Sequence, residues 1–573
     1  MRDPQQRIQT LLAALYGEPR GAATAARLLA MLEAFAVRHG PPRQSAAGER
    51  LTEDDVILIT YGDQVQAPGQ PALQTLGATL EHSFADIVSG LHLLPFFPFS
   101  SDDGFSVIDY LSVDPALGSW ADVEYLSRRY RLMVDAVVNH VSAGSAWFRA
   151  FLAGVPGAEA RFHLVEPGTD LRAVTRPRTS PLLTPFATPT GVRHVWTTFS
   201  ADQIDLNYAN PELLLEMTDV LLAYVAHGAR FIRLDAIGYL WKEPGTRCIH
   251  LPNTHRVVQL WRAALDLVAP EVLLITETNV PHADNISYFG DGTNEAQLVY
   301  QFPLAPLVLH AFASGDATRL SDWARELAPP SPATAFFNFL ASHDGIGVVP
   351  ASGILQPAEV LALCARVEHH GGRVSYKTNP DGSQSPYELN CTWFDALSDP
   401  ATAEPQARRV ERFCASQAIM LALQGVPGVY IHSLLGSPNH HAGLAATGRF
   451  RSLNREKWTR AELEARIADP SRHEGAVLQR MAALIRTRRH ERAFHPNGPQ
   501  QVLALGEAIF ALERQSPEGD ATVLCLHNVA DTPQQVPLTL GRAAHDLVGG
   551  RRYPAGAQSL QLAPYQVAWL KLA

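Results

Sequence analysis

Between residues 51 and 432, short apolar runs alternate with longer amphipathic stretches, and this alternation limits the folds that the chain can adopt. The runs that resemble buried strands lie at 56–60, 91–96, 132–138, 231–235, 272–276, 298–302, 336–341 and 426–432. Stretches of helical periodicity separate several of these runs, as at 211–227, 254–268 and 406–424. Strands that alternate with helices favour an α/β fold with a parallel sheet, and eight such strands predict a closed (β/α)8 TIM barrel.

Two long segments interrupt this alternation, residues 142–204 and residues 345–403. The first holds several prolines and the second holds the turn-forming pair Gly371-Gly372. Long irregular insertions in an α/β barrel usually build the rim of the active site. We therefore expect a catalytic barrel over residues 51–490 that carries two rim insertion domains.

The two ends of the chain differ from this central region. Residues 1–50 show leucine-rich helical periodicity and predict a helical N-terminal extension that packs on the barrel. Residues 495–573 are typical of a C-terminal all-β domain, a small β-sandwich that we expect to serve stability. Its predicted strands lie at 501–504, 508–514, 522–528, 535–540, 559–562 and 566–571.

The composition argues against several classes of function. With a net charge of −10, the chain lacks the excess of basic residues that would bind nucleic-acid phosphates or a membrane surface. The five cysteines show no CxxC spacing, which disfavours a zinc site and a disulfide framework. No apolar signal segment or membrane span is evident, so a cytoplasmic enzyme is expected. The composition does not reveal the oligomeric state.

One strand-like run ends in a pair of opposite charges, Arg233 and Asp235, within residues 231–239. Two residues apart on a strand, the two side chains point to the same face. A guanidinium beside a carboxylate is expected to lower the carboxylate pKa, and an ionised, positioned aspartate can act as a nucleophile. The alternative is a buried ion pair that only holds the strand register, and this stretch alone does not separate the two.

Other polar residues also gather where the proposed strands end, which is where a barrel enzyme has its active site. They are Asp63 after the first strand, Asp135, Asn139 and His140 at the third, Glu277 at the fifth, and His343 and Asp344 at the seventh. Converging carboxylates suit either a metal site or glycoside chemistry, in which one carboxylate is the nucleophile and one carboxyl is the acid/base. Arg233 disfavours the metal, because its guanidinium would compete with a cation.

Four short segments at these strand ends resemble the signature regions of the α-amylase superfamily (glycoside hydrolase family 13). They are residues 135–140, 233–236, 277 and 342–344, and the resemblance covers about residues 51–490. It implies a retaining double displacement with Asp235 as the nucleophile, Glu277 as the acid/base and Asp344 as the transition-state stabiliser.

The same resemblance implies a set of residues that bind the sugar. Arg233, His140 and His343 would hold the sugar and the developing charge, and Gln203 belongs to a further matching region at 203–205. By position, Asp63 and Arg455 would bind the 4- and 6-hydroxyl side of a terminal glucose. Closing that end of the pocket would limit the enzyme to one glucosyl unit.

A narrower resemblance is to the sucrose phosphorylase subfamily, which passes a glucosyl group to inorganic phosphate instead of water. The matching segments are 176–178, 195–199, 236–239, 242–246, 343–347, 387–390 and 454–455. Phosphate that enters a carboxylate-rich pocket needs a nearby cation, and Arg178 is the candidate because guanidinium matches oxyanions bidentately. A salt bridge that anchors the loop is the alternative for Arg178. Phe199 would be an apolar platform beside the glucose, with core packing as its alternative.

The chain departs from the sucrose-specific pattern at Tyr387-Glu388, where sucrose phosphorylases typically carry Tyr-Gln. The segments at 278–282, 371–377 and 385–388 look more like those of glucosylglycerate phosphorylases. An acid at position 388 offers the acceptor substrate only hydrogen-bond acceptors, which suits the hydroxyls of a small polyol acid. Tyr387 and Glu388 are therefore predicted to bind the acceptor, and a glycerate carboxylate would pair with Arg178 or Lys377.

The predicted function is that of a retaining glycoside phosphorylase. It would transfer a glucosyl unit from a small α-glucoside, with glucosylglycerate favoured over sucrose, to inorganic phosphate. No cofactor or metal is expected, and neither nucleic acid nor membrane is a predicted partner. A hydrolase or transglucosidase of the same fold is the alternative. An inactive binding module is disfavoured, because Asp235, Glu277 and Asp344 are all present.

Overall fold

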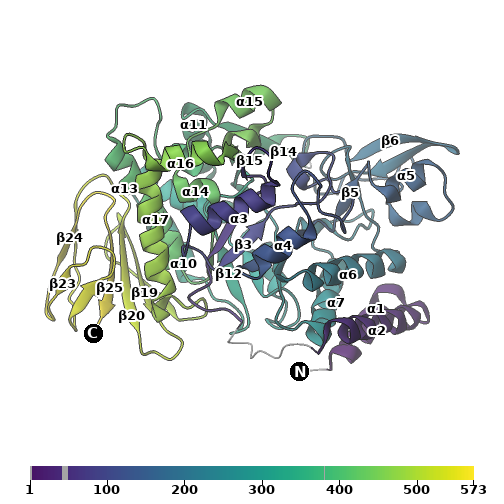
Figure 1. Ribbon diagram of the computed structural model, residues 1–573, viewed down its shortest axis with the longest axis horizontal. Helices are drawn as coiled ribbons and strands as arrows, with labels where there is room; N and C mark the ends of the chain where they lie inside the picture. The colour runs from purple at the N-terminus through teal and green to yellow at the C-terminus, as the bar shows by residue number, and fades with distance from the viewer. Residues whose placement is uncertain (1–2, 42–49, 380) are drawn as a thin grey trace.

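A closed barrel of eight parallel strands forms the centre of the molecule (Figure 1). The computed structural model describes residues 3–41, 50–379 and 381–573. Taken around the barrel, the strands are β1 (Ile57–Thr60), β3 (Gly90–Leu93), β4 (Arg131–Ala136), β9 (Ala229–Leu234), β10 (Leu273–Thr276), β11 (Leu298–Tyr300), β12 (Ala335–Asn338) and β16 (Val426–Tyr430). Each of the eight predicted strands is present, and the predicted barrel is confirmed.

Six of the eight strands end one to three residues earlier than the apolar runs predict, whereas β1 and β10 end at the predicted residue. β3 stops at Leu93 because Pro95 follows, and proline cannot donate a hydrogen bond to a strand ladder. β9 stops at Leu234, so Asp235 is the first residue beyond the ladder. The polar side chains of interest therefore lie in the loops at the carboxyl end of the barrel, where the backbone is free to turn.

Helices cover the outside of the barrel (Figure 1). They include α3 (Ala72–Ser83), α4 (Trp120–Ser127), α6 (Pro211–Ala226), α7 (Pro252–Val268), α8 (His282–Ile286), α9 (Leu304–Ser314), α10 (Thr318–Arg325), α13 (Gln406–Ala422), α14 (Ile431–Leu435), α15 (His441–Thr447), α16 (Arg460–Ala468) and α17 (Glu474–Arg489). The start of α6 illustrates the local cause: the Asn210 side chain accepts a hydrogen bond from the Glu212 backbone N–H at 3.1 Å, and Pro211 occupies the first helical turn.

Both predicted insertions contain small antiparallel sheets in place of the irregular loops that were expected. The first holds β5 (His140–Ser142), α5 (Ala146–Leu152), β6 (Leu183–Thr188), β7 (Gly191–Trp196) and β8 (Gln203–Asp205), with β5 paired to β8 and β6 to β7. The second holds β13 (Ile346–Gly347), α11 (Pro357–His369), β14 (Arg373–Thr378), β15 (Gln384–Asn390) and α12 (Trp393–Leu397). In its sheet, β15 is the central strand between β13 and β14.

The C-terminal region is a two-layered β structure, as predicted. One sheet has the order β18 (Gln500–Leu503), β19 (Ile509–Gln515), β20 (Thr522–Asn528), β25 (Val567–Leu572), β22 (Ala544–Asp546) and β23 (Arg552–Tyr553), and β21 (Gln534–Val536) pairs separately with β24 (Leu560–Leu562). On β20, Val523 and Cys525 join the main core, whereas Leu524 and Leu526 face the small second sheet. Sequence analysis missed β22 and β23, because runs so short carry no periodic pattern.

The N-terminal helices α1 (Pro4–Tyr16) and α2 (Arg20–His39) lie beside α6 and α7 (Figure 1). Arg7 of α1 forms an ion pair with Asp266 of α7 at 3.1 Å, and the Tyr16 hydroxyl donates to the Tyr208 carbonyl oxygen at 2.9 Å. The helices predicted for this region are therefore present and packed on the barrel. The predicted boundary near residue 50 adjoins residues 42–49, which lie outside the described residues.

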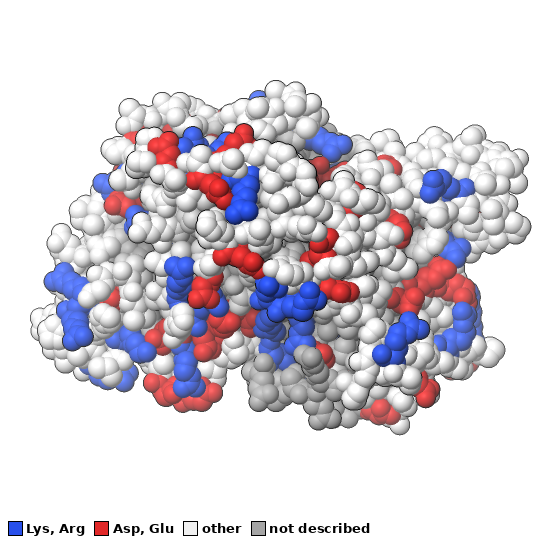
Figure 2. Space-filling view, viewed as in Figure 1, with Lys and Arg blue, Asp and Glu red and all other residues white. Residues whose placement is uncertain are grey.

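The surface carries side chains of both charges, and the cysteines lie in the interior. Figure 2 shows acidic and basic side chains interspersed over the visible face. None of the helices in the described ranges is long and apolar enough to cross a membrane. All five cysteines are buried and free.

Arg488 of α17 is fully buried, and its guanidinium joins parts of the chain that are distant in sequence. It donates to the carbonyl oxygens of Leu421 at 3.2 Å, Gly425 at 3.0 Å and Phe494 at 3.2 Å. We predict that Arg488→Ala lowers the free energy of unfolding by about 3 kcal/mol or more, because it leaves buried carbonyl groups without donors. Chemical denaturation would measure the loss.

The neighbouring Arg489 provides the control. It pairs with Asp54 at 2.7 Å, and that carboxylate is half exposed. Arg489→Ala should therefore change the free energy of unfolding by about 1 kcal/mol or less. Equal losses in the two variants would contradict the structural role assigned to Arg488.

Candidate active site

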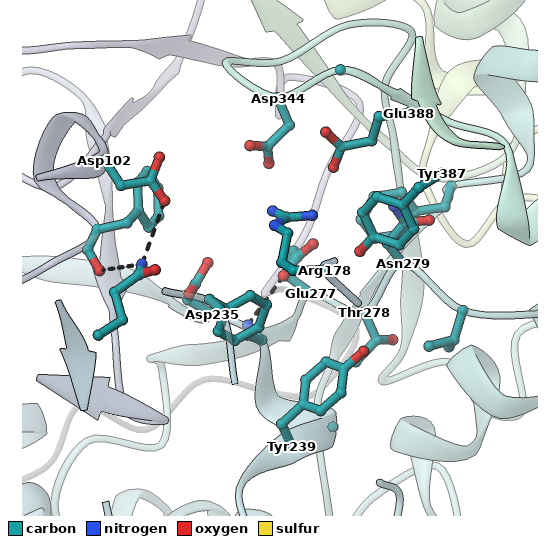
Figure 3. Close-up of a pocket in the computed structure, with 18 of the residues that line it drawn as sticks. Asp102, Arg178, Asp235, Tyr239, Glu277, Thr278, Asn279, Asp344, Tyr387 and Glu388 are labelled. Carbon is teal, nitrogen blue, oxygen red and sulfur yellow. Dashed lines mark hydrogen bonds between the residues drawn. The ribbon is translucent and has the colours of Figure 1, made fainter. Parts of the chain in front are cut away.

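A pocket opens at the carboxyl end of the barrel and is closed on its sides by the two insertions (Figure 3). Of the residues singled out in the sequence, those lining it are His140, Arg178, Phe199, Gln203, Asp235, Glu277, His343, Asp344, Tyr387 and Glu388. The polar residues that follow distant strands are thus brought into one space, as the ring of strand ends predicts. Figure 3 shows Asp235, Glu277, Asp344 and Arg178 around this space.

Arg233 lies directly behind the pocket and holds two carboxylates. Its Nη1 is 2.9 Å from the Asp235 carboxylate, and it also forms a short ion pair with Asp135. His92 binds the other oxygen of Asp135 at 2.7 Å. Although burial opposes it, the charges of Arg233 and His92 hold the pKa of Asp135 at about 2. The guanidinium charge is therefore shared between Asp135 and Asp235.

This sharing corrects the expectation that Arg233 lowers the pKa of Asp235. Burial raises the pKa of Asp235 to about 7, and Arg233 only partly offsets the effect. The neighbouring carboxylates Asp135 and Asp344 raise this pKa further. The environment of Asp235 therefore favours one retained proton near the centre of the pocket.

Glu277 is the group best placed to hold that proton. Burial raises the pKa of Glu277 to about 7 as well. Its carboxyl accepts a hydrogen bond from the Ala236 backbone N–H at 3.1 Å, and it lies 3.8 Å from the Arg233 guanidinium. Because the Arg233–Asp235 contact is shorter, at 2.9 Å, the negative charge is better stabilised on Asp235 and the proton on Glu277. Such a division would suit a reaction that needs one nucleophile and one acid.

Asp344 is the third carboxylate of the pocket and remains ionised. Arg451 Nη1 lies 2.6 Å from its Oδ1, and His343 Nε2 lies 3.5 Å from its Oδ2. Burial raises the pKa of Asp344, but Arg451, His343 and Arg455 outweigh it and hold that pKa well below its usual range. The pocket therefore keeps a fixed negative charge beside the other two carboxyl groups.

Two of the histidines that line the pocket, His140 and His343, are neutral. Burial lowers the pKa of both His140 and His343. His140 Nε2 lies 2.8 Å from the Phe105 carbonyl oxygen, and since that oxygen can only accept, Nε2 carries the proton. His343 stacks on the Phe105 ring with centroids 4.7 Å apart. Neither ring therefore adds a charge to the pocket.

Four of the predicted binding residues do not line the pocket: Arg233, which lies behind it, and Asp63, Arg455 and Lys377. Asp63 pairs with Lys457 instead, and Arg455 pairs with Asp103 at 2.5 Å and donates to the His343 carbonyl oxygen at 2.7 Å. Lys377 lies on β14, and burial lowers its pKa. Ion-pair partners hold Asp63 and Arg455 outside the pocket, and the register of β14 places Lys377 outside it. Neither effect can be predicted from position in the sequence.

The structure instead brings Asp102 to the pocket, from the loop that follows β3. Asp102 and Asp103 both have positive φ angles, 54° and 50°, which is an uncommon and strained backbone for residues other than glycine. No site residue was predicted after the second strand. The segment 100–104, in which two adjacent aspartates precede a glycine, could have indicated one.

Arg451 is a second charged lining residue that was not predicted from the sequence. It lies in the short 3-10 helix η7 (Phe450–Asn454), beyond β16. The matching segment 454–455 overlaps the end of this helix, but no motif or strand end marks position 451 itself.

A buried ammonium lies beside the pocket. Lys242 Nζ is 2.6 Å from Asp205 Oδ2 and 2.7 Å from Asn139 Oδ1. The positive charge of Lys242 thus already satisfies the oxygen atoms around Asn139. Within the described part of the chain, no group of three or more His, Cys, Asp and Glu residues is arranged to hold a metal ion.

The fold and the site together define a class of protein. Three carboxyl groups, Asp235, Glu277 and Asp344, meet at the carboxyl end of a (β/α)8 barrel, an arrangement typical of enzymes that act on glycosides. Residues 87–349 match the family model of the α-amylase catalytic domain. Residues 507–570 match that of the C-terminal immunoglobulin-like domain of D-apionate lactonase.

Comparison with individual proteins narrows the class. The chain is 52% identical over 566 residues to a glucosylglycerate phosphorylase of Allomeiothermus silvanus, covering 99% of this chain and 98% of that one. It is 44% identical over 568 residues to a glucosylglycerate phosphorylase of Escherichia coli, covering 99% and 100%. A sucrose phosphorylase of Agrobacterium vitis is 32% identical over 468 residues, covering 77% and 89%.

A solved structure agrees with this placement. The crystal structure of sucrose 6F-phosphate phosphorylase from Thermoanaerobacter thermosaccharolyticum has a TM-score of 0.73 and 25% identity, and it covers 85% of this chain and 96% of that chain. The chain belongs to the α-amylase family, in its branch of glycoside phosphorylases.

The raised pKa of Glu277 predicts a pH-dependent stability. Because its pKa is about 7 in the folded protein, the folded state holds the proton of Glu277 more tightly than the unfolded chain does. Its contribution to stability is complete at pH 4 and is lost as the pH rises through 7. We predict that Glu277→Gln, which stays neutral, becomes more stable than the wild type by about 1–3 kcal/mol between pH 5 and pH 8.

Unfolding curves of the two proteins at pH 5 and pH 8 would test this. Glu33→Gln, at an exposed position on α2, should show no such change with pH. A constant difference between Glu277→Gln and the wild type at both pH values would contradict the protonated state of Glu277.

Proposed function

We propose that the protein transfers a glucosyl unit from glucosylglycerate to inorganic phosphate and releases α-glucose 1-phosphate. The observation that carries the proposal is the guanidinium of Arg178, which faces the carboxyl groups of the pocket without an acidic partner among the described residues. Phosphate and glycerate are both anions, so the reaction in either direction brings a negative charge to this position. Full-length similarity to three glucosylglycerate phosphorylases, at 52%, 48% and 44% identity, supports glycerate as the acceptor.

In the first step, the Asp235 carboxylate attacks the anomeric carbon of the glucosyl unit. The bond from that carbon to the glycerate oxygen breaks, and the proton of Glu277 passes to the leaving oxygen. A covalent glucosyl ester forms on Asp235. Asp344, which keeps its charge, stabilises the positive charge that develops on the sugar ring.

In the second step, a phosphate oxygen attacks the anomeric carbon from the face that glycerate has left. The Glu277 carboxylate takes the proton of the phosphate hydroxyl, and the ester bond to Asp235 breaks. Two inversions retain the configuration at the anomeric carbon, so the product is α-glucose 1-phosphate.

Arg178 and Phe199 support the acceptor side of this mechanism. The Arg178 guanidinium lies 5.8 Å from the centre of the Phe199 ring and 5.2 Å from that of the Tyr387 ring. Its only described hydrogen bond is to the Pro177 carbonyl oxygen at 3.4 Å, so the loop-anchoring salt bridge considered for it is not formed by the described residues. Aromatic rings hold the cation in place and leave its donors available for an oxyanion. Phe199 lines the pocket, which favours the platform interpretation.

The acceptor assignment is tested in the synthetic direction. Phosphate release from α-glucose 1-phosphate is measured with glycerate, glycerol and fructose in turn, and we expect the rate with glycerate to exceed the others by at least about tenfold, the factor that 1.4 kcal/mol provides. Preference for fructose would favour a sucrose phosphorylase. Release of free glucose from the glucoside at one rate with and without phosphate would favour a hydrolase.

Variants assign the roles of Asp235 and Arg178. Asp235→Ala should abolish turnover, because no covalent ester can form. Arg178→Ala should lower kcat/KM for phosphate by about 10- to 100-fold, since a charge-assisted hydrogen bond contributes about 1.5–3 kcal/mol. Arg172 in the same insertion is exposed and paired with Asp170, so Arg172→Ala should leave the rate unchanged. An active Asp235→Ala variant would overturn the mechanism.

A further inference from the structure

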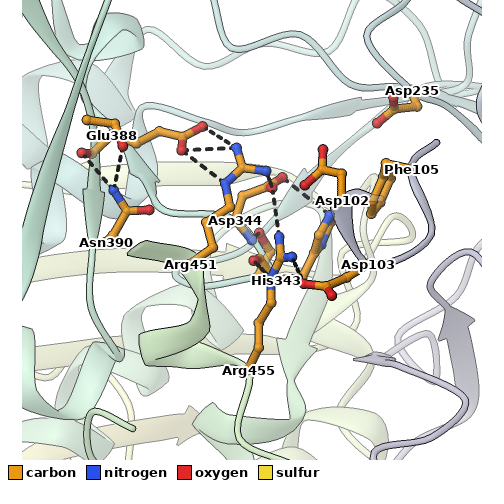
Figure 4. A network of polar contacts seen from close by, with 12 residues as sticks. Asp102, Asp103, Phe105, Asp235, His343, Asp344, Glu388, Asn390, Arg451 and Arg455 are labelled. Atoms are coloured by element: carbon orange, nitrogen blue, oxygen red, sulfur yellow. Dashed lines mark hydrogen bonds and ion pairs between the residues drawn. The ribbon is translucent and has the colours of Figure 1, made fainter. Parts of the chain in front are cut away.

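Arg451 connects two acidic residues that come from different parts of the fold (Figure 4). Its Nη1 lies 2.6 Å from Asp344 at the end of the barrel. Its Nη2 lies 2.8 Å and 3.0 Å from the two carboxylate oxygens of Glu388, and its Nε lies 3.3 Å from one of them. The Nε and Nη2 atoms of the Arg451 guanidinium thus contact Glu388, and Nη1 contacts Asp344.

The carboxylate of Glu388 is fully used in its contact with Arg451. Its side chain is only 6% exposed, and both carboxylate oxygens accept hydrogen bonds from Arg451. It lies on β15, the central strand of the small sheet, opposite Gly347 on one side and Ser375 on the other. A carboxylate that is buried, bidentate and carried by a central strand has little freedom to follow an acceptor hydroxyl.

The charges explain why such an anchor is useful here. The substrates of the proposed reaction are anions, and a guanidinium in the pocket that is paired with Asp344 alone could swing toward a phosphate or carboxylate group. Such a swing would remove the contact that orients Asp344. The bidentate contact with Glu388 fixes the Nε and Nη2 edge, so Arg451 stays on Asp344 while an anionic substrate enters.

The backbone around Asp344 is held independently of Arg451. Asn454 Nδ2 donates to the carbonyl oxygens of Ser342 at 3.0 Å and Asp344 at 2.9 Å. Arg455 Nε donates to the His343 carbonyl oxygen at 2.7 Å. A change at Glu388 or Arg451 therefore disturbs the Asp344 carboxylate and leaves its main chain in place.

We propose that Glu388 is a positioning residue that acts through Arg451 on Asp344, and that it is not a ligand of the acceptor. This replaces the sequence-based assignment of Glu388 to acceptor binding. It rests on the proposed function in one respect, the role of Asp344 in stabilising the transition state.

The test compares two reactions of the same enzyme. One is transfer from α-glucose 1-phosphate to glycerate, and the other is the slow hydrolysis of α-glucose 1-phosphate with water as the only acceptor. If Glu388 positions Asp344, Glu388→Gln lowers kcat for both reactions by a similar factor of about tenfold or more, with little change in the KM for glycerate. If Glu388 binds the acceptor, the variant raises the KM for glycerate and leaves hydrolysis unchanged, which would overturn the proposal.

A double-mutant cycle tests whether the effect passes through Arg451. Arg451→Gln should lower both rates, and adding Glu388→Gln to it should cause no further loss. Arg451→Lys should recover part of the rate, because an ammonium can still pair with Asp344. Independent, multiplying losses in the double variant would also overturn the proposal.

Two controls complete the design. Glu368→Gln, at an exposed position on α11 of the same insertion, should leave both reactions unchanged. Thermal unfolding shows which variants are folded, and Arg451→Lys provides a second route if Glu388→Gln is unstable. If the wild type prefers an acceptor other than glycerate, the proposed function fails, while hydrolysis still reports on Glu388.

Discussion

The ion pairs of Arg233 organise the whole catalytic centre. A guanidinium that is 1% exposed at the base of a barrel would be strongly unfavourable alone, and the carboxylates of Asp135 and Asp235 compensate it. Asp135 comes from β4 and Asp235 follows β9, so the pairs also join two neighbouring strands at the end where they open into the pocket. The same contacts that stabilise the buried charge therefore orient the residue proposed as nucleophile.

The balance between burial and nearby charges sets the different pKa values of the three carboxyl groups in the pocket. Asp235 and Glu277 share the guanidinium of Arg233 with Asp135. Burial raises the pKa of Asp235 and that of Glu277 to about 7. Asp344 shares Arg451 with Glu388 and also lies near Arg455 and His343, and its pKa stays well below the usual range. The distribution of cations, more than the identity of the acids, decides which carboxyl keeps a proton. One pocket can thus hold the residues proposed as nucleophile and acid together with a third carboxylate that stays ionised.

Much of the fold and of the centre could be predicted from the sequence because the relevant signals are local. Buried strands are visible as apolar runs, and parallel strands place their carboxyl ends at one edge, so residues such as Asp235, Glu277 and Asp344 had to converge. The residues at the rim of the pocket were harder to predict from the sequence. Asp63 pairs with Lys457 and stays outside the pocket, whereas Asp102 enters from a strained turn. Such choices depend on partners that are hundreds of residues away along the chain.

The sequence by itself determined the barrel, its family and the set of acids at the strand ends, because hydrophobic periodicity and motif order are properties of neighbouring residues. Only the tertiary structure decided how those acids are charged and what Glu388 contacts. The pKa of a carboxyl depends on its burial and on the cations within a few ångströms. Arg451 contacts both Glu388 and Asp344 because η7 packs against β15 and against the segment that follows β12, a placement that no local pattern in the sequence records.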